Sequence, residues 1–229
     1  MTQTDHLTVD AFIEHFKQQE KRGKLARYEH LNKMVRKGQI LFCGSSLMEQ
    51  FPVHELLMDL GVDLDLAVYN RGVGGFTTTE MMENLETLVF DLEPAHIFIN
   101  IGTNDLNGEA YREEDLIKRY EWILTRIGKR LPEASLHILA YYPCAKDRSR
   151  MDPKMQEEFR CRTNERVYSA NQAVAALAER TGAEFLDFND AITDEAGYLR
   201  EEYSVEGVHM YGDGYRKILE QMLPLLQRL

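Results

Sequence analysis

Five short, nearly continuous apolar runs divide the chain from residue 39 onward. They are Gln39–Cys43, Leu64–Tyr69, Ala95–Ile101, Leu136–Tyr142 and Ala183–Phe188. Runs of this length, without regular polar alternation, are typical of strands that are buried on both faces of a parallel sheet. We therefore expect five parallel strands.

The segments between and after these runs have helical spacing. They are Thr77–Phe90, Arg112–Leu131, Met155–Thr181 and Gly214–Leu229. Alternating strands and helices predict an α/β fold with right-handed crossovers. The expected architecture is three-layer α/β/α and flavodoxin-like, with a five-stranded parallel sheet in the order 2-1-3-4-5. We expect one domain over residues 1–229, with residues 1–37 as a charged, helical N-terminal extension.

Composition narrows the function classes. The formal net charge of -11 argues against binding to nucleic acid and against a polybasic membrane anchor. The three cysteines form no C-x-x-C pair, which argues against a disulfide framework and a structural zinc site. No apolar run approaches the ~18 residues that a membrane span needs, and the first residues do not resemble a secretory signal. We expect a cytoplasmic protein without a bound metal, and whether it forms homo-oligomers is left open.

Polar residues with chemical potential follow several of the predicted strands. Gly44-Ser45-Ser46 follows the first strand, a glycine-rich turn ending at Gly75 follows the second, and Gly102-Thr103-Asn104-Asp105 follows the third. A fourth segment, Glu206-Gly207-Val208-His209, precedes the last helix. In such a fold ligands bind beyond the carboxyl ends of the strands, at the switch point. A hydroxyl, glycine amides, a carboxamide and a histidine near a carboxylate are the parts of an acyl-transfer site.

These segments resemble the SGNH, or GDSL, hydrolases, a family of esterases and lipases with a flavodoxin-like fold. The sequences ILFCGSSLM and INIGTND are similar to the first and third family blocks, and all four blocks occur in order between about residue 39 and the C-terminus. Two positions depart from the family pattern. Ser45 stands where the family usually has Asp, and Glu206 stands where Asp usually precedes the histidine by three residues.

The resemblance implies a role for each site residue. Ser46 would be the nucleophile, His209 its general base and Glu206 the carboxylate that orients the imidazole. The amides of Ser46 and Gly75 and the side chain of Asn104 would stabilise the oxyanion. A small-molecule ester would be the substrate, and no cofactor would be needed.

Each of these residues also has a structural interpretation. Either Ser45 or Ser46 fits a helix N-cap, and Ser45 is the expected one. The glycine-rich turn fits an ordinary tight turn but not a dinucleotide-binding loop, because Thr77 stands where that motif needs a third glycine. Asn104 would also suit a loop position where its side chain bonds to the nearby backbone, and we expect Asp105 to stabilise that loop. The alternatives to Glu206 are Asp187, Asp190 and Glu202.

Several functions share this set of residues. A serine esterase, a thioesterase and a carbohydrate O-acetylesterase would all use them, and a binding module without turnover would retain the fold. The segment Pro143–Arg162 follows the fourth strand, and 10 of its 20 residues are charged. If it forms a wall of the site, short acyl groups on a polar alcohol are the expected substrates. Otherwise its charges solvate a helix, and Met151, Met155 and Phe159 pack against the domain.

Overall fold

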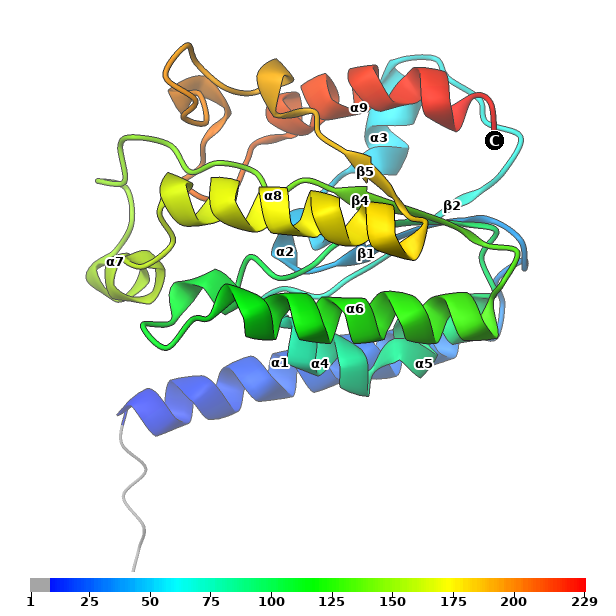
Figure 1. The fold of residues 1–229 in the computed structure, drawn as a ribbon, viewed down its shortest axis with the longest axis horizontal. Helices are drawn as coiled ribbons and strands as arrows, with labels where there is room; N and C mark the ends of the chain where they lie inside the picture. Colours follow the sequence, from blue (N-terminus) through cyan, green and yellow to red (C-terminus); the bar gives the residue numbers. More distant parts are fainter. Residues whose placement is uncertain (1–8) are drawn as a thin grey trace, which may run out of the picture.

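The computed structural model describes residues 9–229, which fold around one sheet (Figure 1). All strands are parallel and lie in the order β2-β1-β3-β4-β5. They are β1 Ile40–Gly44, β2 Val68–Gly72, β3 His96–Asn100, β4 Ser135–Leu139 and β5 Glu184–Leu186. The predicted fold class and strand order are confirmed.

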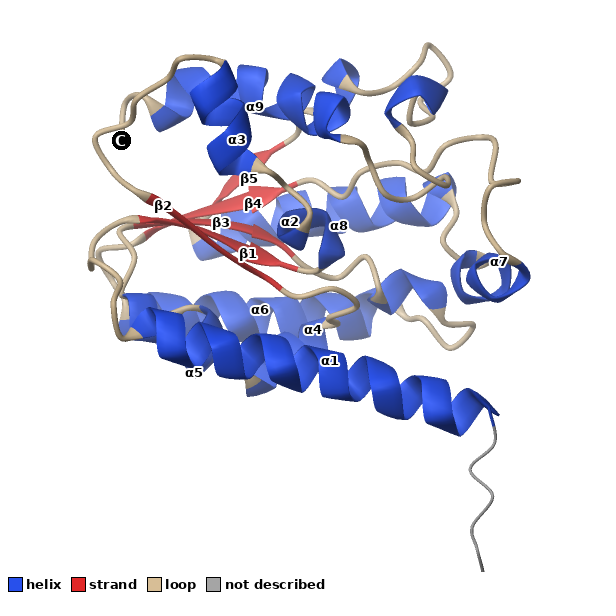
Figure 2. Ribbon diagram, turned by 180° about the vertical axis from the view of Figure 1, so that it is seen from behind, coloured by secondary structure: helices blue, strands red, loops and turns tan. Residues whose placement is uncertain are grey.

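Helices cover both faces of the sheet (Figures 1 and 2). One face packs against α2, α3 and α9, and the other packs against α4, α5, α6 and α8. The helices are α1 Val9–Asn32, α2 Ser46–Glu49, α3 Val53–Asp59, α4 Thr78–Glu83, α5 Leu85–Leu88, α6 Glu113–Arg130, α7 Pro153–Phe159, α8 Asn164–Thr181 and α9 Gly212–Leu226. Short 3-10 helices span Phe90–Leu92, Asp105–Asn107, Asn189–Ala191 and Glu201–Tyr203. Within the described chain, no helix has the length and apolar character needed to cross a membrane.

Burial on both faces explains why the sequence of β1, an interior strand of the sheet, is apolar at every position. Leu41 and Cys43 enter the core cluster on the α6 side, whereas Ile40 and Phe42 enter the cluster on the α9 side. All residues of β1 are buried. A strand covered on both faces has no position that water reaches, so the polar alternation is lost.

The second strand lies further along the chain than its apolar run predicted. The expected strand Leu64–Tyr69 is wrong at its start, because β2 begins at Val68 and ends at Gly72. Leu64 and Leu66 instead pack from the preceding loop against the α9-side core. Since β2 is an edge strand, it accommodates the polar Asn70 and Arg71 that ended the apolar run.

Two predicted helices are each divided in the structure. The helix expected over Thr77–Phe90 breaks at Asn84, whose Nδ2 donates to the Glu80 carbonyl oxygen at 2.7 Å. Side-chain bonds of this kind compete with the helical backbone. The helix expected over Met155–Thr181 is α7 followed by α8, and Thr163 caps the second by accepting from the Arg166 N–H.

Residues 1–8 of the expected N-terminal extension lie outside the described residues. Helix α1 runs beside α5 (Figure 2) and packs Leu25 and Tyr28 against the α6-side core. The Tyr28 hydroxyl donates to the Gly72 carbonyl oxygen at 2.7 Å, and Asn32 Nδ2 donates to the Thr87 carbonyl oxygen at 2.7 Å. These contacts fix α1 to the end of β2 and to α5.

Candidate active site

The turn after β1 presents Ser46 at the edge of the sheet. Gly44 has φ +151°, and a Cβ there would lie only 2.0 Å from the Asn100 carbonyl oxygen. Glycine therefore allows the chain to turn sharply from strand to helix. Ser45 occupies the N-cap position of α2 but makes no capping hydrogen bond, and its buried hydroxyl has no partner in residues 9–229. Ser46, the next residue, is half-buried and lines a cavity.

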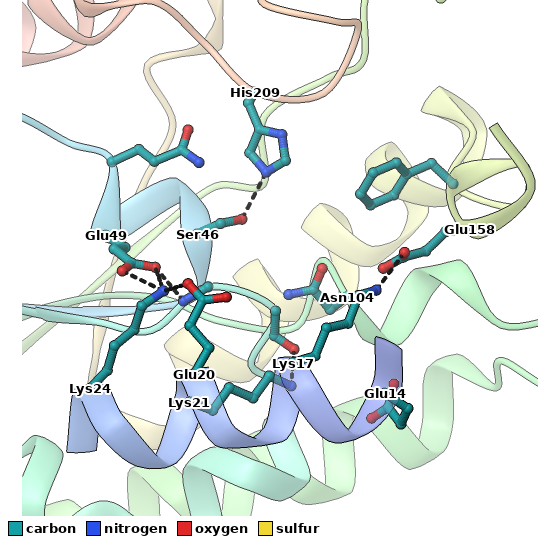
Figure 3. A pocket seen from close by; sticks show the side chains of 14 residues that line it. Glu14, Lys17, Glu20, Lys21, Lys24, Ser46, Glu49, Asn104, Glu158 and His209 are labelled. Atoms are coloured by element: carbon teal, nitrogen blue, oxygen red, sulfur yellow. Dashed lines mark hydrogen bonds and ion pairs between the residues drawn. The ribbon is translucent and has the colours of Figure 1, made fainter. Parts of the chain in front are cut away.

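Ser46, His209 and Glu206 form a hydrogen-bonded chain. Ser46 Oγ lies 3.0 Å from His209 Nε2 (Figure 3), and His209 Nδ1 lies 2.6 Å from Glu206 Oε1. The same Glu206 oxygen accepts from the His209 backbone N–H at 3.1 Å. The longer glutamate side chain thus folds back onto its own turn to reach the ring. The structure places Glu206 against the imidazole, and not one of the alternatives named above.

The environment of Glu206 favours its charged form. Burial raises the pKa of the carboxyl, but hydrogen bonds and charge from His209 and the backbone N–H of Val208 outweigh it and leave the pKa below its usual value. A carboxylate can only accept a hydrogen bond. It therefore selects the tautomer with a proton on Nδ1, and Nε2 of His209 is then free to accept the Ser46 proton.

Two residues that line the cavity, Ser46 and Gly75, have backbone N–H groups available for a ligand. The N–H groups of Ser46 and Gly75 bond to no other group in the described part of the chain. Ser46 is the first residue of α2, and Gly75 has the positive φ of +75° that glycine tolerates. Both residues line the cavity with Asn104, so the structure brings the three sequence-predicted oxyanion residues together.

Contacts on both sides of Asn104 hold its carboxamide. Its Nδ2 donates to the Phe76 carbonyl oxygen at 2.9 Å, and its Oδ1 accepts from Nη2 of Arg162 at 2.7 Å. The neighbouring Asp105 braces the loop by accepting from the Thr78 N–H at 3.0 Å and hydroxyl at 2.5 Å. The contact of Arg162 with Asn104 could not be predicted from the sequence, in which Arg162 is one of many charged residues in its segment.

The cavity has a volume of about 400 Å³, and α1 forms one of its walls (Figure 3). The sequence left open whether the segment that follows β4 forms a wall, and the structure places Glu158 and Phe159 of that segment in the cavity lining. Helix α1 contributes five lining residues: Glu14, Lys17, Glu20, Lys21 and Lys24. The N-terminal helix is therefore part of the site and not only a packed extension.

The lysines of α1 are neutralised by carboxylates from other elements. Lys17 pairs with Glu158 at 2.8 Å, Lys21 with Glu80 at 2.7 Å and Lys24 with Glu49 at 2.8 Å. The residues of these pairs also contact the turn that contains Gly74 and Gly75. Lys21 Nζ donates to the Gly75 carbonyl oxygen at 3.0 Å, and Glu49 accepts from the Gly74 N–H at 2.5 Å.

Apolar side chains of the segment after β4 pack mainly against the domain. Met151 is buried in a small cluster with Cys144, Phe159 and Val208, and Met155 packs against that cluster. The Phe159 ring also meets the His209 ring edge-on, with centroids 6.2 Å apart. Among residues 9–229, no group of three or more His, Cys, Asp or Glu side chains is arranged to hold a metal ion.

The chain is similar in structure to several solved proteins. A Streptococcus pneumoniae protein named for platelet activating factor superposes with a TM-score of 0.82 and 28% identity, covering 94% of this chain and 96% of that chain. A GDSL-like lipase from Bacteroides thetaiotaomicron gives a TM-score of 0.71 at 20% identity, covering 89% and 97%.

Sequence comparison identifies the family of this chain. The human platelet-activating factor acetylhydrolase IB subunit alpha2 is 23% identical over 192 residues, which cover 83% of this chain and 76% of that protein. The family model of the GDSL-like lipases and acylhydrolases matches residues 44–217, from the end of β1 into α9. The chain therefore belongs to the GDSL-like Lipase/Acylhydrolase family.

Proposed function

We propose that this protein is a serine esterase that cleaves small carboxylic esters with Ser46 as nucleophile. The observation that carries the proposal is the hydrogen-bonded chain from Ser46 Oγ through His209 to Glu206, with separations of 3.0 and 2.6 Å. Ser46 is half-buried and lines the cavity together with Gly75, and within residues 9–229 the N–H groups of both are unused. This is the arrangement that acyl transfer needs: an activated nucleophile next to oxyanion donors.

In the proposed reaction, Ser46 Oγ attacks the ester carbonyl carbon while His209 Nε2 takes its proton. Glu206 stabilises the imidazolium that forms. The carbonyl oxygen becomes an oxyanion, which accepts from the N–H groups of Ser46 and Gly75 and from Asn104 Nδ2. His209 then protonates the leaving alcohol. Water attacks the acyl-enzyme with the same histidine as base, the bond from the acyl carbon to Ser46 Oγ breaks, the carboxylic acid leaves, and His209 returns the proton to Ser46 Oγ.

The lining of the cavity supports a short acyl group and a polar alcohol. Phe159 is the one large apolar side chain among the described residues that line it, and lysines and glutamates occupy most of the remaining wall. Binding a long acyl chain depends on removing methylenes from water, at ~0.8 kcal/mol each, which a charged wall does not supply. The human relative is named as an acetylhydrolase, which agrees with a short acyl group.

Two measurements test this proposal. A fluorophosphonate probe followed by mass spectrometry should find one adduct, on Ser46, whereas a binding module without turnover would remain unlabelled. With p-nitrophenyl esters from acetate to decanoate, kcat/KM should be highest for the shortest chains. A steady rise toward decanoate would contradict the short-chain preference, and acetylated sugars and acyl thioesters in the same panel would separate the O-acetylesterase and thioesterase alternatives.

A further inference from the structure

Arg162 determines how the carboxamide of Asn104 is oriented. Its Nη2 donates to Asn104 Oδ1 at 2.7 Å, and its Nε donates to Asn107 Oδ1 at 2.8 Å. A guanidinium only donates and the Phe76 carbonyl only accepts, so these contacts fix which end of the carboxamide is oxygen and which is nitrogen. The Phe76 carbonyl uses one Nδ2–H of Asn104. The second N–H remains for the cavity that Asn104 lines.

The charge of Arg162 is buried and has no ion-pair partner among residues 9–229. The side chain is 2% exposed, its fork bonds to two neutral carboxamides, and its guanidinium stacks on the Phe159 ring with the charge 4.7 Å from the centroid. Desolvation lowers the pKa of Arg162 to about 10, so the group remains charged at neutral pH. Where water is excluded, such a charge polarises the group that accepts its hydrogen bond.

We propose that Arg162 is a positioning residue for the oxyanion hole and acts through Asn104. It holds the carboxamide with Nδ2 toward the cavity, and it withdraws electron density from Oδ1, which makes the remaining N–H a stronger donor. This contribution is largest when the ester oxygen carries negative charge, because aligned donors then need no reorganisation. The inference rests on the proposed esterase function.

A double-mutant cycle with p-nitrophenyl acetate tests the coupling between the two residues. N104A should lower kcat by ~100-fold, as is usual for the loss of one oxyanion donor. R162M should lower kcat by about 10-fold and change KM by less than about 3-fold, because the lost interaction belongs to the transition state. In the N104A background, R162M should cost less than about 2-fold more, since its target is already gone.

The matched control is R148M. Arg148 lies in the same segment and donates to the backbone carbonyls of Phe159 and Arg162, but it contacts no oxyanion residue. R148M should retain kcat to within about 2-fold, because the hydrogen bonds of Arg148 go to backbone carbonyls of the segment and not to the side chain of Asn104. An equal loss in R148M and R162M would mean that both merely anchor the segment, and would overturn the inference. The inference would also be overturned if the losses of R162M and N104A multiplied in the double mutant.

Circular dichroism checks that each variant folds. If R162M does not, the same cycle is run with R162K, which keeps the charge but loses the planar fork. Its loss of about 3-fold or more in kcat should vanish in the N104A background, and a loss that persists there overturns the inference. An inactive, unlabelled wild-type protein would overturn the proposed function itself, whereas an active one with normal R162M would overturn only the role of Arg162.

Discussion

Two Ser–His–Glu constellations lie at opposite ends of the same sheet. The first is the site at Ser46. In the second, Ser135 Oγ lies 3.2 Å from His137 Nε2, and His137 Nδ1 lies 2.8 Å from Glu184 Oε2. Ser135 and Glu184 are the first residues of β4 and β5, and His137 lies two positions into β4, so the constellation lies toward the amino end of these strands. By residue type and distance alone, the two constellations are nearly the same.

Their surroundings differ in ways that decide what each can do. The Ser135 N–H donates to the Ala95 carbonyl oxygen at 2.9 Å, and His96 Nδ1 approaches the Ser135 hydroxyl at 2.6 Å. Neither Ser135 nor His137 lines the cavity that contains Ser46. Glu184 has 54% of its side chain exposed, against 9% for Glu206. We therefore expect a bonded triad to act as an active site only where unused N–H groups and a cavity accompany it.

The largest expected effect separates the two serines. Ser46→Ala should lower kcat/KM for p-nitrophenyl acetate by roughly 10⁴-fold or more, because the nucleophile is lost. Ser135→Ala, the matched control, should stay within about 2-fold of wild type, as a change away from the chemistry does. Steady-state assays and probe labelling check both. An adduct on Ser135, or on Ser45, would reverse the assignment.

The next largest effect should separate the two carboxylates, Glu206 and Glu184, by the activity that each variant loses. Glu206→Gln should leave about 10²-fold more activity than His209→Ala, because an orienting acid is less critical than the base and Gln still offers an oxygen to Nδ1. Glu184→Gln serves as the control and should leave kcat unchanged. Equal losses in Glu206→Gln and His209→Ala, with both proteins folded, would show that the charge of Glu206 is as indispensable as the base.

The strand ends at the Ser46 site could be predicted from sequence because buried parallel strands have an apolar signature and end at recognisable turns. Gly44, Gly102 and the residues after them follow directly from the runs now seen as β1 and β3. The start of β2 could not be predicted, because Leu64 and Leu66 are apolar for packing and not for strand formation. Hydrophobicity reports burial, and it reports secondary structure only through periodicity.

The sequence carries no comparable signal for the wall of the cavity that α1 forms. The sequence of α1 predicts a charged helix, but the direction of Lys21 and Lys24 depends on how the helix docks beside α5, which is a tertiary property. The same applies to Arg162, which reaches Asn104 across 58 positions of sequence. Its segment is positioned by the packing of Met151 with Val208. No local pattern encodes such contacts.

Replacing Lys21, which bonds to the turn at Gly75, should have a moderate effect. Lys21→Met removes the contact to the Gly75 carbonyl oxygen and loosens the neighbouring N–H groups, so kcat should fall by about 10-fold, within the range that small misplacements cost. Lys37→Met is the control, because Lys37 also pairs with a glutamate, Glu93, and donates to a backbone carbonyl, but near the amino end of β3. Equal kcat values for the two variants would mean that the Lys21 contact from α1 does not contribute to catalysis.

The smallest expected effect lies at the second constellation and concerns stability. Burial lowers the pKa of His96, helped by the charge of His137, and burial lowers the pKa of His137 despite the opposing hydrogen bond and charge of Glu184. A histidine with a depressed pKa in the folded state binds more protons when unfolded. Its contribution is therefore complete above the unfolded value of about 6.5 and is lost as pH falls through the folded pKa.

Tm should accordingly decrease between pH 7 and pH 5, and His137→Gln should reduce that decrease by at most about 2–4 °C, since Gln keeps hydrogen-bonding atoms but does not titrate. His30→Gln, at an exposed position of α1, measures what the substitution itself does. Thermal unfolding followed by circular dichroism at several pH values gives the slopes. If His137→Gln leaves the pH dependence of Tm unchanged while His30→Gln alters it, the acid sensitivity does not arise at the amino end of the sheet. The second constellation would then be an ordinary hydrogen-bonded edge with no titration linked to folding.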